Sequence, residues 1–155
     1  MDGYIWVGEV YMGGDTPMDV VYDTGSDWLV VEGMDCWNCE GNVYDPFDEL
    51  SDLGRAQRIS EGWSTREYGS AYLEGYEYLD TVCLTPNAST CIENFEYFLI
   101  FYQEGLWEPV DGILGLSRNH PFFIGDDYIN YTGPLFVEYL AKEGIIDSNK
   151  FSFYL

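Results

Sequence analysis

Short stretches in which apolar and polar residues alternate recur along the chain, and they predict a protein built mainly of β-strands. Aromatic and β-branched residues are frequent in these stretches, and clusters of Gly, Asp and Pro separate them. A turn is predicted at residues 13–17. The predicted strands cover residues 4–7, 10–12, 18–22, 28–31, a hairpin over 65–82, 96–102, 110–116 and 151–155.

Helical spacing of apolar residues is confined to two regions. Leu135, Phe136, Tyr139 and Leu140 share one helical face, with Pro134 suited to the start of a helix and Gly144 to its end. Between residues 47 and 59 the apolar positions indicate a short helix or an irregular turn. The pattern therefore predicts a mostly β protein with one or two short helices.

The length and composition of the chain indicate a single domain. Its 155 residues, 46% of them hydrophobic and 18% aromatic, provide for a single domain with a real core but are too few for two ordinary lobes. The net charge of −22 would repel nucleic acid and anionic membranes, and no apolar run is long enough to insert into a membrane. The charge suits either an acidic compartment or simple solubility of a tyrosine-rich surface.

Four cysteines allow more than one interpretation. Cys36 and Cys39 suit a local disulfide, half of a zinc site or a redox pair, whereas Cys83 and Cys91 flank a predicted hairpin tip and suit a cross-hairpin disulfide. We favour the disulfides Cys36–Cys39 and Cys83–Cys91. Together with glycosylation sequons at Asn87 and Asn130, they indicate a secretory route.

A polar turn between two apolar runs carries the strongest candidate for chemistry. Val20, Val21 and Tyr22 precede Asp23, and Trp28 to Val31 follow the turn. An Asp beside a Gly is most often only a turn former, but a turn held between buried strands is a rigid mount for a general acid or base. Asp23 is the candidate residue. His120, the one histidine, is predicted to lie in a surface loop.

The sequence Asp23-Thr24-Gly25-Ser26 after Val20-Val21-Tyr22 resembles the first catalytic loop of the pepsin-like aspartic proteases. Tyr68-Gly69-Ser70 resembles the tip of the flap that covers the cleft in this family, and Val110 to Leu116 resembles the strand that supports the catalytic loop. The stretch from Cys36 to Pro46 resembles the Cys-x-x-Cys and Phe-Asp-Pro region of the family. The motifs occur in family order over nearly the whole chain.

The resemblance implies a fold and a set of roles. The fold would be a single lobe, of the six-stranded β-barrel or sandwich type, with residues 1–155 as the N-terminal lobe and the C-terminal lobe absent from this chain. Asp23 would be catalytic, Thr24, Gly25 and Ser26 would support it, and Val110 and Ile113 would line a substrate pocket. The substrate would be a peptide or protein, in a secreted enzyme or one of an acidic vacuole or lysosome, with neither cofactor nor metal.

Two departures from the family pattern bear on activity. The family uses two aspartates, one per lobe, and no second Asp-Thr-Gly or Asp-Ser-Gly occurs here. The other half would come from a C-terminal lobe on a separate or cleaved chain, or from a second copy of this chain. Seven residues after Asp23, where the family carries a Trp that hydrogen-bonds the flap Tyr, this chain has Val30, and its Trp is residue 28. A non-catalytic binding or scaffold protein is therefore the alternative to an endopeptidase lobe.

Overall fold

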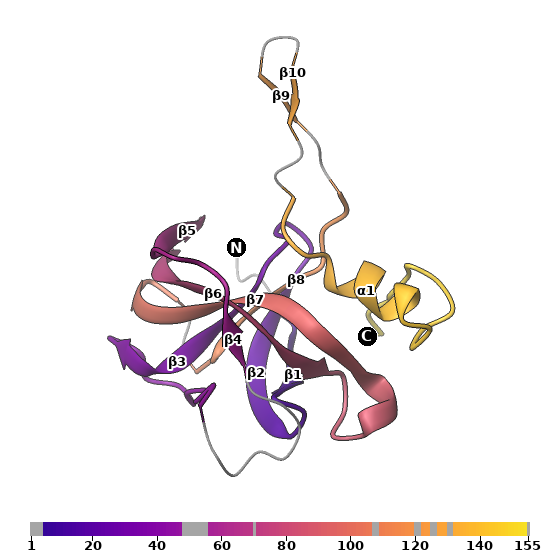
Figure 1. The fold of residues 1–155 in the computed structure, drawn as a ribbon, viewed down its shortest axis with the longest axis horizontal. Coiled ribbons are helices and arrows are strands. Elements are labelled where there is room, and N and C mark those ends of the chain that lie inside the picture. The colour runs from indigo at the N-terminus through magenta and orange to yellow at the C-terminus, as the bar shows by residue number, and fades with distance from the viewer. Residues whose placement is uncertain are drawn as a thin grey trace.

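The computed structural model describes residues 5–47, 56–69, 71–106, 109–119, 122–124, 127–129 and 132–154, and most of them form strands (Figure 1). The mostly β prediction is confirmed. The elements are β1 (Val7–Met12), β2 (Thr16–Asp23), β3 (Leu29–Trp37), β4 (Gln57–Arg58), β5 (Ser64–Tyr68), β6 (Ala71–Cys83), the 3₁₀ turn η1 (Ala88–Thr90), β7 (Cys91–Glu104), β8 (Gly112–Gly115), β9 (Phe122–Ile124), β10 (Asp127–Ile129) and α1 (Phe136–Lys142).

The main sheet curls back on itself. Its strands follow the order β1-β2-β8-β3-β7-β6-β4, and β1 also pairs with β6 through Tyr11 opposite Cys83 and Met12 opposite Val82. This additional pairing joins the two sides of the sheet, so β1, β2, β8, β3, β7 and β6 form a closed circuit. The hairpin of β9 and β10 stands away from the circuit (Figure 1).

Strand β8 lies between β2 and β3. It runs parallel to β2, with Asp23 opposite Gly115, and antiparallel to β3, with Val30 opposite Ile113. A Cβ at Gly112 would overlap the carbonyl oxygen of Val30, and a Cβ at Gly115 would overlap the backbone of Asp27. Glycine at these two positions therefore lets β8 lie close to β3 and to the residues just before it.

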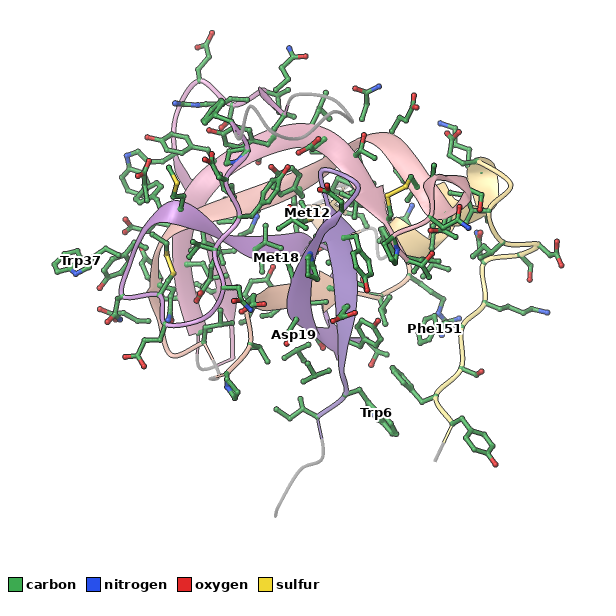
Figure 2. The ribbon with its side chains drawn as sticks, turned by 90° about the horizontal axis from the view of Figure 1, so that it is seen from below. Trp6, Met12, Met18, Asp19, Trp37 and Phe151 are labelled. Atoms are coloured by element: carbon green, nitrogen blue, oxygen red, sulfur yellow. A yellow bond between two sulfur atoms is a disulfide. The ribbon has the colours of Figure 1, made fainter. Side chains whose placement is uncertain are left out.

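The apolar faces of the strands enclose two clusters of buried side chains. Alternate residues of β1 and β2, including Met12 and Met18, point into the larger cluster (Figure 2). Helix α1 covers one side of it through Phe136 and Leu140, and it ends before Gly144, whose φ of 71° is the left-handed value expected after a helix. The smaller cluster includes Val30, Phe98 and Ile113 and lies under the candidate site.

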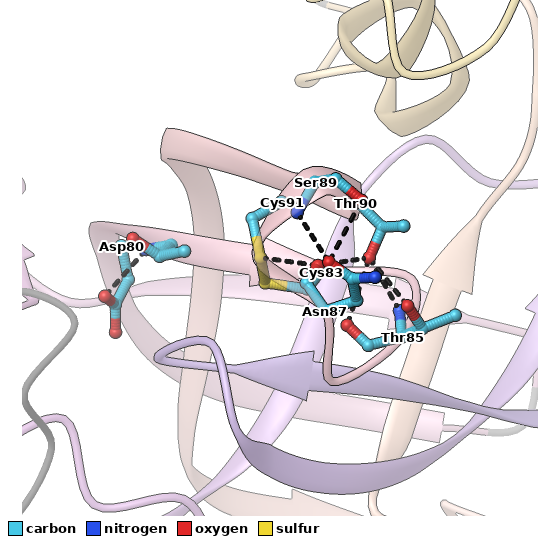
Figure 3. Close-up of a disulfide and its surroundings, with 8 residues drawn as sticks. Asp80, Cys83, Thr85, Asn87, Ser89, Thr90 and Cys91 are labelled. Carbon is cyan, nitrogen blue, oxygen red and sulfur yellow. Dashed lines mark hydrogen bonds between the residues drawn. A yellow bond between two sulfur atoms is a disulfide. The ribbon is translucent and has the colours of Figure 1, made fainter.

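Both expected disulfides are present. Cys36 bonds to Cys39, and Cys83 bonds to Cys91 across the β6–β7 hairpin. At the tip of this hairpin the Asn87 side chain accepts hydrogen bonds from the Ser89 amide and hydroxyl, each at 3.0 Å (Figure 3). Disulfide sulfurs are not thiolate ligands, so the bond between Cys36 and Cys39 argues against the zinc interpretation of this pair.

Several predicted boundaries differ from the observed ones. Residues 151–154 do not form the expected strand, because no strand of the described chain pairs with them; instead the Phe153 ring stacks on Trp6 at a centroid distance of 5.2 Å. Residues 5 and 6 precede the first strand, and Thr16 and Pro17 belong to β2 rather than to the turn. Most of the possible helix at 47–59 lies outside the described residues, and Gln57–Arg58 is a strand.

Candidate active site

The loop that carries Asp23 is held by backbone hydrogen bonds from the end of β8. The amides of Leu116, Ser117 and Gly115 donate to the carbonyls of Asp23, Ser26 and Trp28 at 2.7, 2.9 and 2.9 Å. The loop also joins β2 to β3, two strands whose inward residues are buried. Because both ends and the middle are anchored, the loop is a rigid mount for a side chain.

Asp23 sits at the edge between core and solvent. Its side chain is half-buried, and its Oδ1 accepts a hydrogen bond of 2.9 Å from the Gly25 amide. This bond leaves the remaining carboxylate lone pairs available to a water or a substrate. Thr24 and Gly25 are exposed, and Ser26 Oγ is buried with no hydrogen-bond partner among the described residues.

A hairpin of β5 and β6 faces this loop. The two strands pair from Ser64 opposite Gly75 to Tyr68 opposite Ala71, so the turn falls at residues 69 and 70. Gly69 has a φ of 49°, a value suited to glycine, whereas Ser70 lies outside the described residues. The hairpin predicted from the sequence is thus present, with Tyr68 as the last residue of β5.

An open cleft of about 500 Å³ separates the loop from the hairpin. Its walls are formed by Asp23, Gly25, Ser26, Asp27, Trp28, Arg66, Glu67, Tyr68 and Gly69. The pKa of the Tyr68 hydroxyl is raised, first by burial and then by the negative charges of Asp27 and Asp23, while the positive charge of Arg66 opposes them. Tyr68 is therefore protonated at any acidic or neutral pH and offers an O–H donor near both carboxylates.

Val110 and Ile113 lie beneath this cleft rather than in its lining. Both are buried in the smaller cluster together with Val30, and Tyr68 packs against that cluster. Val30 thus replaces the hydrogen-bonding Trp of the family with an apolar contact surface. The role of Val110 and Ile113 in substrate binding stays a prediction.

Asp111 anchors the start of β8, at the end of the strand away from the loop that carries Asp23. This carboxylate is almost fully buried and accepts hydrogen bonds from the Asp19 amide at 2.7 Å and the Asn42 amide at 2.6 Å. It therefore joins β2 and the segment after the Cys36–Cys39 disulfide to the start of β8. The sequence singled out the stretch around Asp111 but not this anchoring role.

Asp27, Trp28, Arg66 and Glu67 in the cleft wall were not expected from the sequence, and two of them contact each other. Trp28 follows the loop that carries Asp23, and the Arg66 guanidinium lies over its ring, with 4.4 Å between the guanidinium carbon and the ring centroid. A strand periodicity of two is the signal that could have found Arg66, because it places Arg66 on the same face of β5 as Tyr68.

The remaining candidate residues lie away from the cleft. Asn87 is exposed at the β6–β7 hairpin tip, so its sequon is open to solvent, whereas Asn130 and His120 lie outside the described residues. Within the described ranges, no group of three or more His, Cys, Asp or Glu side chains is placed to hold a metal ion. None of the described helices is both long and apolar enough to cross a membrane.

A closed β circuit that presents an Asp-Thr-Gly-Ser loop beneath a hairpin is the arrangement of an acid-protease lobe. The model of the family described as eukaryotic aspartyl protease matches residues 5–155. Since this match spans almost the entire chain, the chain belongs to the eukaryotic aspartyl protease family. Among curated proteins no match is found.

Proposed function

We propose that this chain is one lobe of an aspartic endopeptidase and that Asp23 is one of its two catalytic aspartates. The observation that carries the proposal is the position of Asp23 on a loop anchored by β8, facing Tyr68 across an open cleft. Residues 1–155 form the N-terminal lobe. Thr24, Gly25 and Ser26 support the carboxylate, and Tyr68, Gly69 and Ser70 form the flap.

Two facing carboxylates explain how such an enzyme hydrolyses a peptide. The two carboxyl groups share one proton and hold a water between them. They lie so close together that both do not carry a negative charge at once. One carboxylate takes a proton from the water as its oxygen attacks the peptide carbonyl carbon, and the other donates a proton to the carbonyl oxygen, which gives a tetrahedral diol. The first carboxyl then passes its proton to the peptide nitrogen and the second carboxylate takes a proton from a hydroxyl of the diol, as the C–N bond breaks and releases an amine and a carboxylic acid. The hydrogen bond of 2.9 Å from the Gly25 N–H orients the Asp23 carboxylate for this exchange.

The second aspartate comes from a C-terminal lobe, on a separate or cleaved chain, or from a second copy of this chain. An aromatic surface next to the catalytic strand supports such a partner: Trp6 and Phe151 lie on the same side of the molecule (Figure 2), and Phe153 and Tyr154 are also exposed, Tyr154 to 95%. Tyr22, the neighbour of Asp23, contacts Phe153 at a ring distance of 6.5 Å. A lobe docked here would be continuous with the site.

The two disulfides and the family indicate an extracellular or vacuolar compartment. Within that range we place the enzyme in the secretory pathway, either secreted or in an acidic vacuole or lysosome, with glycans at Asn87 and Asn130. An acidic compartment suits a chain with a net charge of −22, because protonation of carboxylates lowers its self-repulsion.

The test is cleavage of an unfolded protein at pH 3–5 by the chain together with its second lobe, with and without pepstatin. We expect pepstatin-sensitive cleavage, and a loss of roughly 10²-fold or more in kcat/KM for Asp23→Asn, since the amide neither takes up nor releases the proton. Asp35→Asn is the matched control, because Asp35 is an exposed carboxylate on β3 outside the cleft, and it should keep full activity.

Cleavage that persists in Asp23→Asn would contradict the proposal. A folded wild-type assembly that binds peptides but never cleaves them would instead favour the second candidate, a non-catalytic binding or scaffold protein. Val30 is the observation that favours this second candidate, since it removes the hydrogen bond that supports the flap in the family.

A further inference from the structure

Arg66 is placed where the flap meets the catalytic loop. It lies on β5 two residues before Tyr68, and its side chain is only 19% exposed. Its guanidinium carbon is 4.4 Å from the Trp28 ring centroid and 4.6 Å from the Phe98 ring centroid. The guanidinium is therefore held by two aromatic rings, one next to the catalytic loop and one on β7.

The polar edge of the guanidinium is fixed within the flap hairpin itself. Nη2 donates to Glu77 Oε1 at 2.7 Å, and Nη1 donates to Ser64 Oγ and to the Thr65 carbonyl at 3.0 and 2.9 Å. Nε is buried and has no acceptor among the described residues. The hydrogen bonds thus attach Arg66 to β5 and β6, and the ring contacts attach it to the floor of the cleft.

Trp28 is held by contacts of its backbone and of its indole. Its carbonyl accepts the Gly115 amide, and its indole lies so close to Gly133 that a Cβ there would be 2.5 Å from Nε1. The Gly133 amide in turn donates to Asp27 Oδ2 at 2.5 Å. The position of the indole is thus tied to the backbone of the loop that carries Asp23 and to Gly133.

We propose that Arg66 is a positioning residue whose stack on Trp28 attaches the flap to the catalytic loop, in place of the hydrogen bond that Val30 cannot make. It acts through Tyr68, two residues further along the same strand. The proposal rests on the proposed function in taking this hairpin as the flap of a peptidase. Its physical basis, a guanidinium that lies over Trp28 from the middle of the hairpin, is measurable in the chain whether or not the chain cleaves peptides.

The first experiment measures hydrogen exchange of the backbone amides of residues 65–73 in the whole chain. Arg66→Met keeps the length of the side chain but loses the charge and the planar group, and Trp28→Leu loses the ring. We expect Trp28→Leu to speed exchange in this segment roughly 3- to 30-fold, the range that one cation–π contact implies. Arg66→Met should speed it at least as much, because it also loses the Phe98 contact and the hydrogen bonds within the hairpin. The double variant should exchange no faster than the faster single variant, because both changes remove the same contact.

Two controls separate positioning from general loss of structure. Trp28→Phe keeps a ring under the guanidinium and should restore exchange to within about 2-fold of wild type. Arg58→Met removes a similar contact elsewhere, since the Arg58 guanidinium lies 3.7 Å from the Tyr76 ring centroid, and should leave residues 65–73 unchanged. Additive effects of the two single variants, no effect, or an equal increase across all strands would each overturn the inference.

The second experiment measures peptide cleavage by the completed enzyme. Arg66→Met and Trp28→Leu should each lower kcat/KM roughly 10-fold, with no further loss in the double variant and with recovery in Trp28→Phe. A peptidase that is active but insensitive to these changes would overturn this inference and leave the proposed function standing. If no cleavage occurs in wild type, the proposed function fails, and the exchange measurements still decide the role of Arg66.

Discussion

Asp23 and Asp80 are both carboxylates on strands of one closed sheet, yet their surroundings give them different properties. Asp23 is half-buried and opens onto the cleft, whereas Asp80 on β6 is 4% exposed and accepts hydrogen bonds from the Tyr44 hydroxyl and the Thr81 amide. Burial raises the pKa of Asp80, and the two hydrogen bonds lower it by less. Asp80 is therefore a proton-binding group in the core, away from the cleft.

Asp80→Asn tests this description. The folded state binds the Asp80 proton more tightly than the unfolded state, so wild type gains stability as the pH falls from the raised folded-state pKa toward the ordinary value of 3.8. The asparagine variant should lack this part of the gain. Urea unfolding of both proteins between pH 3 and 7 measures this gain. The free energy of unfolding of wild type minus that of the variant should increase as the pH is lowered.

Residues in short motifs could be predicted from the sequence, and residues defined by contacts could not. Asp23 and Tyr68 lie in stretches whose local order is distinctive, so their places on a turn and at a hairpin tip follow from a few neighbours in the chain. The contact between Trp28 and Arg66 joins residues 38 positions apart, and nothing in either local sequence indicates it. Asp111 is similar, because its hydrogen-bond donors come from Asp19 and Asn42.

At the scale of elements, β8 is the strand that the site depends on most. The strand and the two residues after it supply the amides that hold the loop of Asp23, and β8 pairs with β2 over residues 112–115 and with β3 over residues 112–114. Two glycines permit this close approach, one facing the Val30 carbonyl and one facing the backbone of Asp27. Rigid backbone, unlike a flexible side chain, does not move aside for an added methyl group.

Gly112→Ala should therefore destabilise the protein by about 2 kcal/mol or more, because the new Cβ meets backbone. Gly62→Ala is the matched control, since a Cβ at Gly62 has no heavy atom within 4 Å, and its effect should stay within about 0.5 kcal/mol. Denaturant unfolding compares the two. Equal midpoints for both variants would show that β8 is free to shift away from β3.

Elements formed by neighbouring segments were easier to predict than those formed by distant ones. The β5–β6 hairpin, the disulfide-closed tip between β6 and β7 and helix α1 follow from local spacing. The pairing of β1 with β6, which closes the sheet, joins residues about 70 positions apart and left no local trace. The strand expected at 151–155 is the converse case. Its residues suit a strand by their local sequence, but no described strand of this chain pairs with residues 151–154.

For the whole molecule, charge is the dominant property. The chain has 28 acidic and 6 basic residues, and one ion pair, between Arg66 and Glu77, is found among the described residues. Most of the carboxylates therefore repel one another at neutral pH. This repulsion acts on the compact state more than on an expanded chain, in which the charges are further apart.

Added salt should accordingly stabilise the protein at pH 7. Raising NaCl from about 20 mM to about 500 mM shortens the screening length, and we expect a gain of at least about 1 kcal/mol, or about 2–4 °C in Tm. At pH 4 the gain should shrink, because many carboxylates are then protonated. Thermal unfolding followed by circular dichroism at the two pH values measures both effects, and a salt response independent of pH would contradict this account.

The place of β8 in the sheet also determines when the site is completed during synthesis. β2 and β3 are made early, but they do not pair with each other in the finished sheet, because residues 112–115 lie between them. Inserting this strand closes a loop of roughly 80 residues, a slow kind of contact to form. A nascent chain that ends before Gly112 thus contains Asp23 without its mount. The order of translation therefore delays completion of the candidate site until the closed sheet is nearly whole.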